Sequence, residues 1–202
     1  MDSRNFEQAR QYALQRLERE LSPNLLYHGI EHTRDSVVPA AELLAEKEKL
    51  NEEEFHLLMT AAWFHDLGFI QQPAYHELIS TKIAAEVLPN FGYTDDHVET
   101  ICWIIFATVL PQTPVTLLQK IMADADLVVL GSDEFMAHNL ILRRELSFFG
   151  REYTDAEWLK GQLKFLESHT YFTMSARVLW DAGQLKNITN LKNILQEMGE
   201  AA

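Results

Sequence analysis

Four side chains with metal-binding chemistry lie far apart in the sequence, on three different predicted helices. They are His32, His65, Asp66 and Asp126. Imidazole nitrogens and carboxylate oxygens are the ligands that borderline and hard divalent ions accept. A metal ion in such a site polarises a phosphoryl oxygen and lowers the pKa of bound water, which promotes hydrolysis near neutral pH. We therefore expect a catalytic metal centre where these helices converge.

The helical phase of these residues places them with the apolar side chains of their own helices. His65 is in phase with Leu58, Ala61 and Ala62. Asp126 is in phase with Leu118, Met122 and Val129, and His32 is in phase with Ala40 and Leu43. A buried carboxylate without a partner is costly, and a cation shared by all of these groups would offset that cost. The alternative on spacing alone is structural, because a core histidine usually bonds a backbone carbonyl and a His-Asp pair often occurs by chance.

The elements that must position these side chains are helices from one end of the sequence to the other. Period-two alternation is nearly absent, and glycine and proline fall mostly between helical stretches. We predict helices over residues 5–21, 31–49, 51–68, 75–89, 94–108, 113–131 and 132–150, one that begins at residue 154, and two more over 173–182 and 184–198. The fold class is therefore all-α.

Several helix ends carry specific signals. Asn51 followed by Glu54 and Thr154 followed by Glu157 are capping-box pairs. Thr113 with the proline after it is typical of a helix start. Gly68 is the predicted end of the third helix, and Pro39 could kink the second.

Composition narrows the class of partner. The chain has 202 residues, 47% of them hydrophobic, which fits one domain over residues 1–202 with a sizeable core. Its formal charge is −13, with 30 acidic and 17 basic residues. Such a surface repels phosphate backbones, so we expect neither DNA nor long RNA as a partner. A metal with a few local cations can still capture a small phosphorylated substrate.

The single cysteine and the amino terminus indicate a compartment. Cys102 has no partner for an intramolecular disulfide and lies in an apolar run, where a buried, inert thiol is expected. The first twenty residues lack the apolar stretch of a signal peptide, and no segment is apolar over the roughly 20 residues that span a bilayer. We expect a cytoplasmic protein that does not enter the membrane.

Three stretches of the sequence match a known family in order. The segments Tyr27–Thr33 (YHGIEHT), Trp63–Gly68 (WFHDLG) and Ala123–Leu127 (ADADL) resemble the successive signatures of the HD-domain superfamily of metal-dependent phosphohydrolases. The resemblance covers about residues 25–131, and residues 108–131 also resemble a bacterial branch of predicted HD phosphohydrolases. It implies a helical bundle with an HD core over 25–131, on which the helices of 132–199 pack.

The resemblance also implies the ligand set and the metal. His32, His65, Asp66 and Asp126 match the positions that bind one divalent ion in the family. Asp126 fits the last position better than Asp124, which we expect to be an outer partner or solvated. Manganese or iron is the preferred ion, and cobalt, nickel, zinc or magnesium are possible.

Two further residues, His28 and Glu77, are candidates for catalysis alongside Asp66, and His76 is a candidate for holding a second metal. His28 lies four residues before His32, and the segment resembles that of cyclic-nucleotide phosphodiesterases, which implies a general acid, although Gly29 replaces their asparagine. A histidine that only packs the helix entry is equally consistent. Glu77 could orient the attacking water, and His76 could support a second metal. Both could instead be ordinary first-turn residues.

Phosphate binding requires cations. Lys82 and the adjacent pair Arg143 and Arg144 are the candidates for binding the non-reacting phosphate oxygens. Solvated positions on the surface are the alternative for each of them.

We therefore expect hydrolysis of a phosphate ester, with a nucleotide or another small phosphorylated metabolite as substrate. One alternative is a regulatory module that binds metal and nucleotide without turnover. Another is a di-iron oxygenase, which needs more histidine ligands than the sequence offers beyond His76. The sequence does not indicate an oligomeric state.

Overall fold

The computed structural model describes residues 4–199, and every regular element in that part of the chain is a helix. The α-helices are α1 (Phe6–Glu20), α2 (Val38–Lys47), α3 (Glu52–Phe64), α4 (His76–Val87), α5 (Asp95–Phe106), α6 (Leu117–Asp126), α7 (Phe135–Phe148), α8 (Asp155–Ser168) and α9 (Met174–Glu197). Between them lie a π-helix, η1 (His32–Val37), and the 3-10 helices η2 (Leu67–Ile70), η3 (Leu88–Phe91) and η4 (Val128–Gly131). The predicted all-α class is confirmed.

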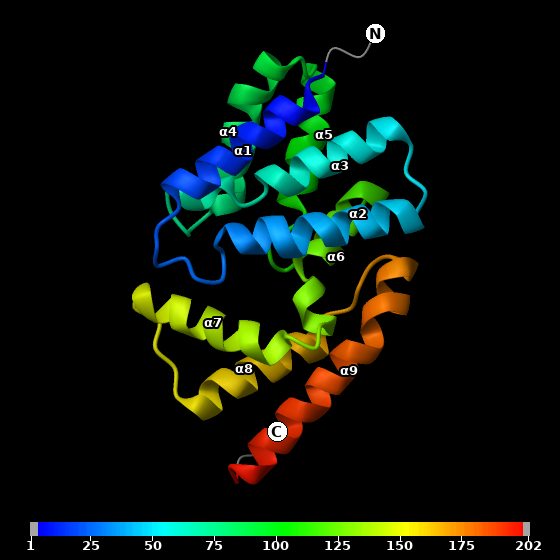
Figure 1. Cartoon of the computed structure of the whole chain (residues 1–202). Helices are drawn as coiled ribbons and strands as arrows, with labels where there is room; N and C mark the ends of the chain where they lie inside the picture. The colour runs from blue at the N-terminus through cyan, green and yellow to red at the C-terminus, as the bar shows by residue number, and fades with distance from the viewer. Residues whose placement is uncertain (1–3, 200–202) are drawn as a thin grey trace.

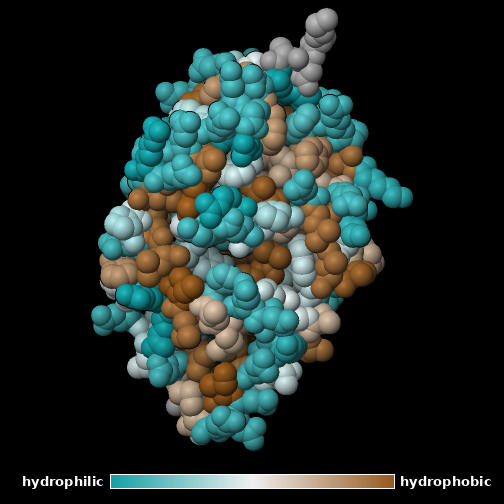
Figure 2. All heavy atoms as spheres, viewed as in Figure 1, coloured by the Kyte–Doolittle hydropathy of each residue, from teal (hydrophilic) through white to brown (hydrophobic). Residues whose placement is uncertain are grey.

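The helices gather in two groups (Figure 1). α1 to α6 occupy the upper part of the view, where α3 packs against α1, α2 and α5, and α6 packs against α2. α7, α8 and α9 lie below, and α9 packs against α8 and against η4, which follows α6. Figure 2 shows mostly hydrophilic residues over the upper helices of this face, whereas apolar residues are more frequent around its middle and lower part.

The core is centred on α3. Every residue from Leu57 to Phe64 is buried, so this helix is apolar on all sides and lies inside the upper group. Its start is fixed by the predicted capping box, in which the Asn51 side chain accepts from the Glu54 amide and the Glu54 side chain accepts from the Asn51 amide. A rigid, buried helix therefore ends at the His-Asp pair.

The end of α3 differs from the prediction, because the helix stops at Phe64 rather than at Gly68. Asp66 leaves the helical conformation at φ −103° and ψ 6°, and η2 follows. A β-carbon at Gly68 would lie 1.9 Å from the carbonyl oxygen of His76. Glycine is required here because α4 begins against this backbone, and not because a helix ends at it.

The predicted break in the last helix is also wrong. α9 is continuous through Gly183, where the sequence suggested two helices. A β-carbon at Gly183 would lie 1.9 Å from the carbonyl oxygen of Gly131 in η4. This glycine lets the long helix pack closely against η4, and helical hydrogen bonding tolerates it.

Both ends of α6 differ from the prediction, whereas the second predicted helix begins where expected. α6 begins behind Thr116, whose side chain accepts from the Gln119 amide, and not at Thr113. α6 ends at Asp126 rather than at Gly131. The second predicted helix begins with the π-helical η1 and continues as α2, so that Pro39 stands in the first turn of α2, where its missing N–H is tolerated.

Within residues 4–199 no helix is both long enough and apolar enough to cross a bilayer. Cys102 is half-buried, and its thiol donates to the carbonyl oxygen of Thr81 over 3.5 Å.

Candidate metal centre

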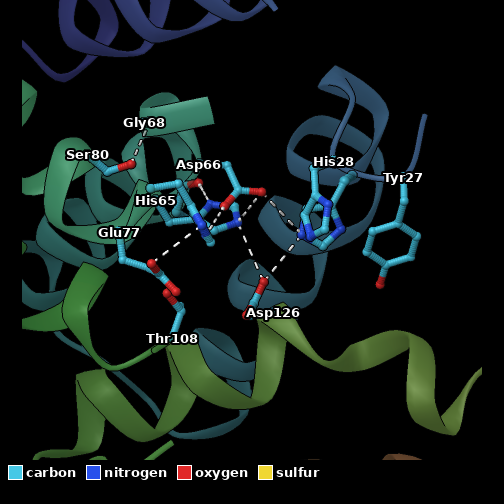
Figure 3. A network of polar contacts seen from close by, with 12 residues as sticks. Tyr27, His28, His65, Asp66, Gly68, Glu77, Ser80, Thr108 and Asp126 are labelled. Carbon is cyan, nitrogen blue, oxygen red and sulfur yellow. Dashed lines mark hydrogen bonds and ion pairs between the residues drawn. The ribbon is translucent and has the colours of Figure 1, made fainter. Parts of the chain in front are cut away.

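The four predicted ligands meet at one point, and each stands at or just beyond the end of a helical element. His65 follows the last residue of α3, and Asp66 precedes η2. His32 is the first residue of η1, and Asp126 is the last of α6. Figure 3 shows His65, Asp66 and Asp126 pointing toward one another. A helix end frees a side chain from the next turn, so three elements can direct these groups inward.

The distances are those of groups crowded around a common centre. Nε2 of His32 lies 3.3 Å from Oδ1 of Asp126 and 3.6 Å from Oδ2 of Asp66. Nε2 of His65 lies 3.3 Å from Oδ2 of Asp66 and 3.6 Å from Oδ1 of Asp126. His32, His65 and Asp66 are buried, and their ligand atoms all lie within 4.8 Å of one another.

The hydrogen bonding of His65 leaves one nitrogen available. Its Nδ1 is 2.8 Å from the carbonyl oxygen of Ala62, which can only accept, so Nδ1 carries a proton. The neutral ring then presents a lone pair on Nε2. Metal-binding histidines generally have this arrangement, in which a backbone carbonyl fixes the tautomer.

Two buried atoms of the group lack hydrogen-bond partners among the described residues: Nε2 of His65 and Oδ2 of Asp66. Leaving a buried polar atom unpaired costs about 1–3 kcal/mol. Two imidazoles and two carboxylates, with both orphaned atoms facing the same point, match the donor set of a divalent transition metal. The residues present therefore fit a metal ion.

The charges of the group are strongly linked. Burial alone would raise the pKa of Asp66, but His65 and His32 outweigh it and hold that pKa well below its ordinary value. Burial likewise opposes ionisation of Asp126, but its hydrogen bond to His32 and the nearby ring of His65 lower its pKa to about 2. In turn the two carboxylates raise the pKa of His65 despite its burial. Both acids are therefore ionised at neutral pH.

Asp124 has a structural role, and the expectation of a solvated or outer position is wrong. It is fully buried and turned toward the start of α9. Its Oδ1 accepts from the Phe172 amide over 2.7 Å, and its Oδ2 accepts from the amide and hydroxyl of Thr173 over 2.8 and 2.7 Å. Asp124 thereby ties α6 to the first turn of α9.

His28 lies beside the four ligands and is held by a residue that the sequence analysis missed. Its Nδ1 lies 2.5 Å from Oε1 of Glu145, on α7. Burial would lower the pKa of His28, but the bond to Glu145 and the charges of Asp66 and Asp126 raise it above the ordinary value. Figure 3 shows His28 near the ligand cluster, with Tyr27 beyond it.

An aromatic ring contacts both His28 and His76, whose own ring centroids are 6.3 Å apart. Phe69, in η2, is stacked on His28 at a centroid distance of 4.5 Å and on His76 at 4.0 Å. Nε2 of His76 lies 3.4 Å from Oδ1 of Asp66, and Nδ1 of His76 donates to the carbonyl oxygen of Pro73 over 3.1 Å. His76 thus borders the cluster on the side of Asp66 that faces away from His32.

Glu77 follows His76 and lies near the centre, where its polar contact is with His76 and not with the four ligands. One carboxylate oxygen is 3.4 Å from Nδ1 of His76. Figure 3 shows Glu77 close to Thr108, and both residues line the cavity described next.

A cavity of about 770 Å³ opens onto His28, Asp66, His76 and Asp126. Its far walls come from α7, α8 and the connection between them, with Asn139, Leu142, Trp158, Gln162 and Phe165 among the lining residues. A smaller cavity of about 340 Å³ is also lined by His32 and Asp126, which both cavities share.

The predicted phosphate-binding cations lie elsewhere. Lys82 and Arg144 are exposed on α4 and α7, and neither lines the large cavity. Arg143 is occupied by Asp155 and by the carbonyl oxygen of Tyr153, at 2.7 and 2.6 Å. Arg151, which the sequence analysis did not select, is the arginine that lines the cavity.

A sequence signal existed for one of the missed residues. Glu145 stands three residues after Leu142, on the inward face of α7, where an acid among apolar positions is informative. Arg151 follows a helix end in a polar connection and carried no such signal.

A family model for the HD domain matches residues 29–129 of the chain. No curated protein is similar enough to count as a match. Among solved structures, a predicted HD superfamily hydrolase from an uncultured Thermotogales bacterium is 19% identical, with a TM-score of 0.64 over 93% of this chain and 92% of that one.

Two further structures share the fold. A Lactobacillus plantarum protein is 18% identical, with a TM-score of 0.69 and 96% of each chain covered. YpgQ from Bacillus subtilis, whose structure is a complex with ADP, is 19% identical, with a TM-score of 0.67 over 95% of this chain and 94% of that one. At these identities the likeness establishes the fold alone.

Proposed function

The chain belongs to the HD domain family, and from this premise we propose that it is a metal-dependent phosphohydrolase acting on a nucleotide or another small phosphorylated metabolite. The observation that carries the proposal is the pair of buried, unpartnered atoms, Nε2 of His65 and Oδ2 of Asp66. They face the point on which His32 and Asp126 also converge. The four side chains would hold one divalent ion, with manganese or iron preferred.

When bound, that ion would polarise a phosphoryl oxygen and lower the pKa of water at the site. Glu77 would orient the attacking water and accept its proton. As the water oxygen bonds to phosphorus, the bond between phosphorus and the leaving oxygen breaks. The leaving oxygen takes a proton from Nε2 of a doubly protonated His28 ring, whose Nδ1 proton stays bonded to Glu145. This assignment rests on the position of Glu77 and His28 in the lining of the large cavity.

The shape and chemistry of the cavity support a small substrate. A volume of about 770 Å³ is within the range of pockets that hold nucleotide-sized ligands. Trp158 and Phe165 offer apolar surface for a base, and Arg151 offers a cation for phosphate oxygens. That YpgQ, which shares the fold, is found with ADP supports a nucleotide. The formal charge of −13 disfavours DNA and long RNA, and a cytoplasmic location is part of the proposal.

The proposal is tested with a panel of nucleotides and small phosphate esters, each assayed with manganese, iron(II), cobalt, nickel, zinc and magnesium. We expect phosphate or pyrophosphate release by the unaltered protein, and loss of turnover in His65→Asn and Asp66→Asn. His56→Asn is the matched control, because His56 lies on α3 as well and stacks on Phe6 away from the centre. Full turnover in Asp66→Asn would refute the proposal.

Two results would favour the alternatives. Nucleotide binding without turnover under every metal would indicate a regulatory module. Two iron ions per chain, in place of one divalent ion, would indicate oxidative chemistry involving His76.

A further inference from the structure

Glu145 is a buried acid at the edge of the proposed active site, on a helix outside the residues that the family model matches. Its side chain is only 3% exposed, and α7 lies beyond residues 29–129. Burying a carboxylate is costly unless its oxygens are well bonded. Both oxygens of Glu145 are bonded to the same short segment, Tyr27 and His28.

The two oxygens have different partners. Oε2 accepts from the backbone amides of Tyr27 and His28, over 2.7 and 2.9 Å. Oε1 faces only the imidazole of His28, with its Nδ1 at 2.5 Å. Oε2 therefore fixes the backbone before η1, whereas Oε1 bonds only to the imidazole ring of His28.

This arrangement determines the orientation of the His28 ring. A carboxylate oxygen can only accept, so the contact places a proton on Nδ1 and leaves Nε2 as the nitrogen available to the cavity. With Nδ1 held protonated, a second proton on this ring resides on Nε2, from which it can be donated. The stacked ring of Phe69, 4.5 Å away by centroid, restricts rotation about the other axis. A histidine that only packed the helix entry would need neither a second buried oxygen nor a fixed tautomer.

We propose that Glu145 is the positioning residue of the reaction, holding His28 with Nδ1 protonated and Nε2 turned toward the substrate. The inference rests on the proposed function, in which Nε2 of His28 protonates the leaving oxygen. It extends that function to α7, so that the site is completed by a helix from beyond the matched region.

The variant Glu145→Gln separates the two roles. Its amide oxygen can still accept from the backbone amides of Tyr27 and His28, so the fold should survive. Its amide nitrogen then faces Nδ1 of His28 and donates to it, which keeps Nδ1 unprotonated. The doubly protonated ring cannot form in this arrangement, and a neutral ring with its proton on Nε2 is a far weaker acid. The matched control is Asp124→Asn, another buried carboxylate that accepts two backbone amides, but at the start of α9.

The tautomer is measured first, on full-length, metal-free protein labelled with nitrogen-15 in its histidines. We expect Nδ1 of His28 to give a protonated signal in the unaltered protein and in Asp124→Asn, and an unprotonated signal in Glu145→Gln. His28→Ala identifies the resonance. This measurement needs no enzymatic turnover, so it tests the positioning role even if the proposed function is wrong. An unprotonated Nδ1 in the unaltered protein would overturn the proposal.

Kinetics on an active substrate supply the second test. A lost proton donor costs about 10²–10⁴-fold in rate, so we expect kcat of Glu145→Gln to fall by about 10²-fold or more, with KM changed by less than about threefold. In a His28→Ala background the same change should have no further effect. Unchanged kcat in Glu145→Gln, or a loss that multiplies with that of His28→Ala, would overturn the positioning role.

Discussion

Replacing Gly68 with alanine should damage both the stability of the fold and the edge of the metal centre. The new β-carbon would lie 1.9 Å from the carbonyl oxygen and 2.6 Å from the carbonyl carbon of His76. Both are backbone atoms, so no side-chain rotation relieves the contact. Ordinary contact begins at 3.4 Å, and the first turn of α4 must therefore move by about 1.5 Å.

The magnitude follows from two effects. Overpacking of this kind costs about 1–3 kcal/mol. The same movement strains the buried hydrogen bond from the Gly68 amide to Oγ of Ser80, now 2.8 Å long, whose loss costs about 1 kcal/mol. A total of roughly 2–4 kcal/mol corresponds to a decrease in Tm of roughly 5–15 °C for a chain of this size. The contact between His76 and Asp66, now 3.4 Å, should lengthen as well.

Thermal and urea unfolding measure the effect, with Gly161→Ala as the matched control. A β-carbon at Gly161, inside α8, would meet no atom within 4 Å. Alanine is favoured over glycine in a helix by up to about 1 kcal/mol, so this variant should gain stability. If Gly68→Ala unfolds at the same temperature and urea concentration as the unaltered protein, the close approach of α4 to η2 is not a feature of the fold in solution.

Three further predictions address the two neighbouring acids, the metal and pH. Asp124→Asn should lower the free energy of unfolding in urea by about 1–3 kcal/mol, because the start of α9 loses an acceptor. Asp126→Asn should instead weaken manganese binding, measured by calorimetry, by more than about 100-fold. The opposite result for the two variants would mean that Asp124 is the metal ligand and Asp126 the structural acid. Removing the metal with a chelator should lower Tm by roughly 5–10 °C if the ion had been present at about 100 times its Kd, and should not affect Asp66→Asn. Burial lowers the pKa of His169 to about 4, so the folded state disfavours the charged form of this side chain. The free energy of unfolding should therefore fall by about 2 kcal/mol as pH decreases from 6.5 to 4. His169→Gln should not show this pH dependence.

The ligand set was predictable because its signal is local. The phase of His65 within an apolar helix can be read from four residues on either side, and the capping box at Asn51 confirms where that helix starts. The same reading favoured Asp126 over Asp124 by phase, and the structure brings Asp126 to the two histidines. Local periodicity suffices when one face of one helix decides the direction of a side chain.

The errors arise where another segment determines the outcome. Glycine is a typical helix-ending residue, but Gly68 and Gly183 each allow the close approach of another element's backbone, that of His76 in α4 and that of Gly131 in η4. Arg143 has the chemistry to bind phosphate, yet the start of α8 engages it. Such contacts depend on how the chain turns between two elements, which helical periodicity does not determine, so these assignments needed the tertiary structure.

The metal ligands and the other residues of the proposed site come from different parts of the chain. The four proposed metal ligands lie within residues 29–129, which the HD domain model matches. The positioning acid Glu145, the cation Arg151 and the aromatic wall at Trp158 all lie beyond that range, on α7, α8 and the connection between them. We infer that the matched region supplies the metal ligands and Glu77, whereas α7 holds the proposed proton donor His28, and α7 and α8 together form the wall that selects the substrate. Exchanging cavity-facing residues of α8 should then change KM among substrates, while manganese affinity stays constant.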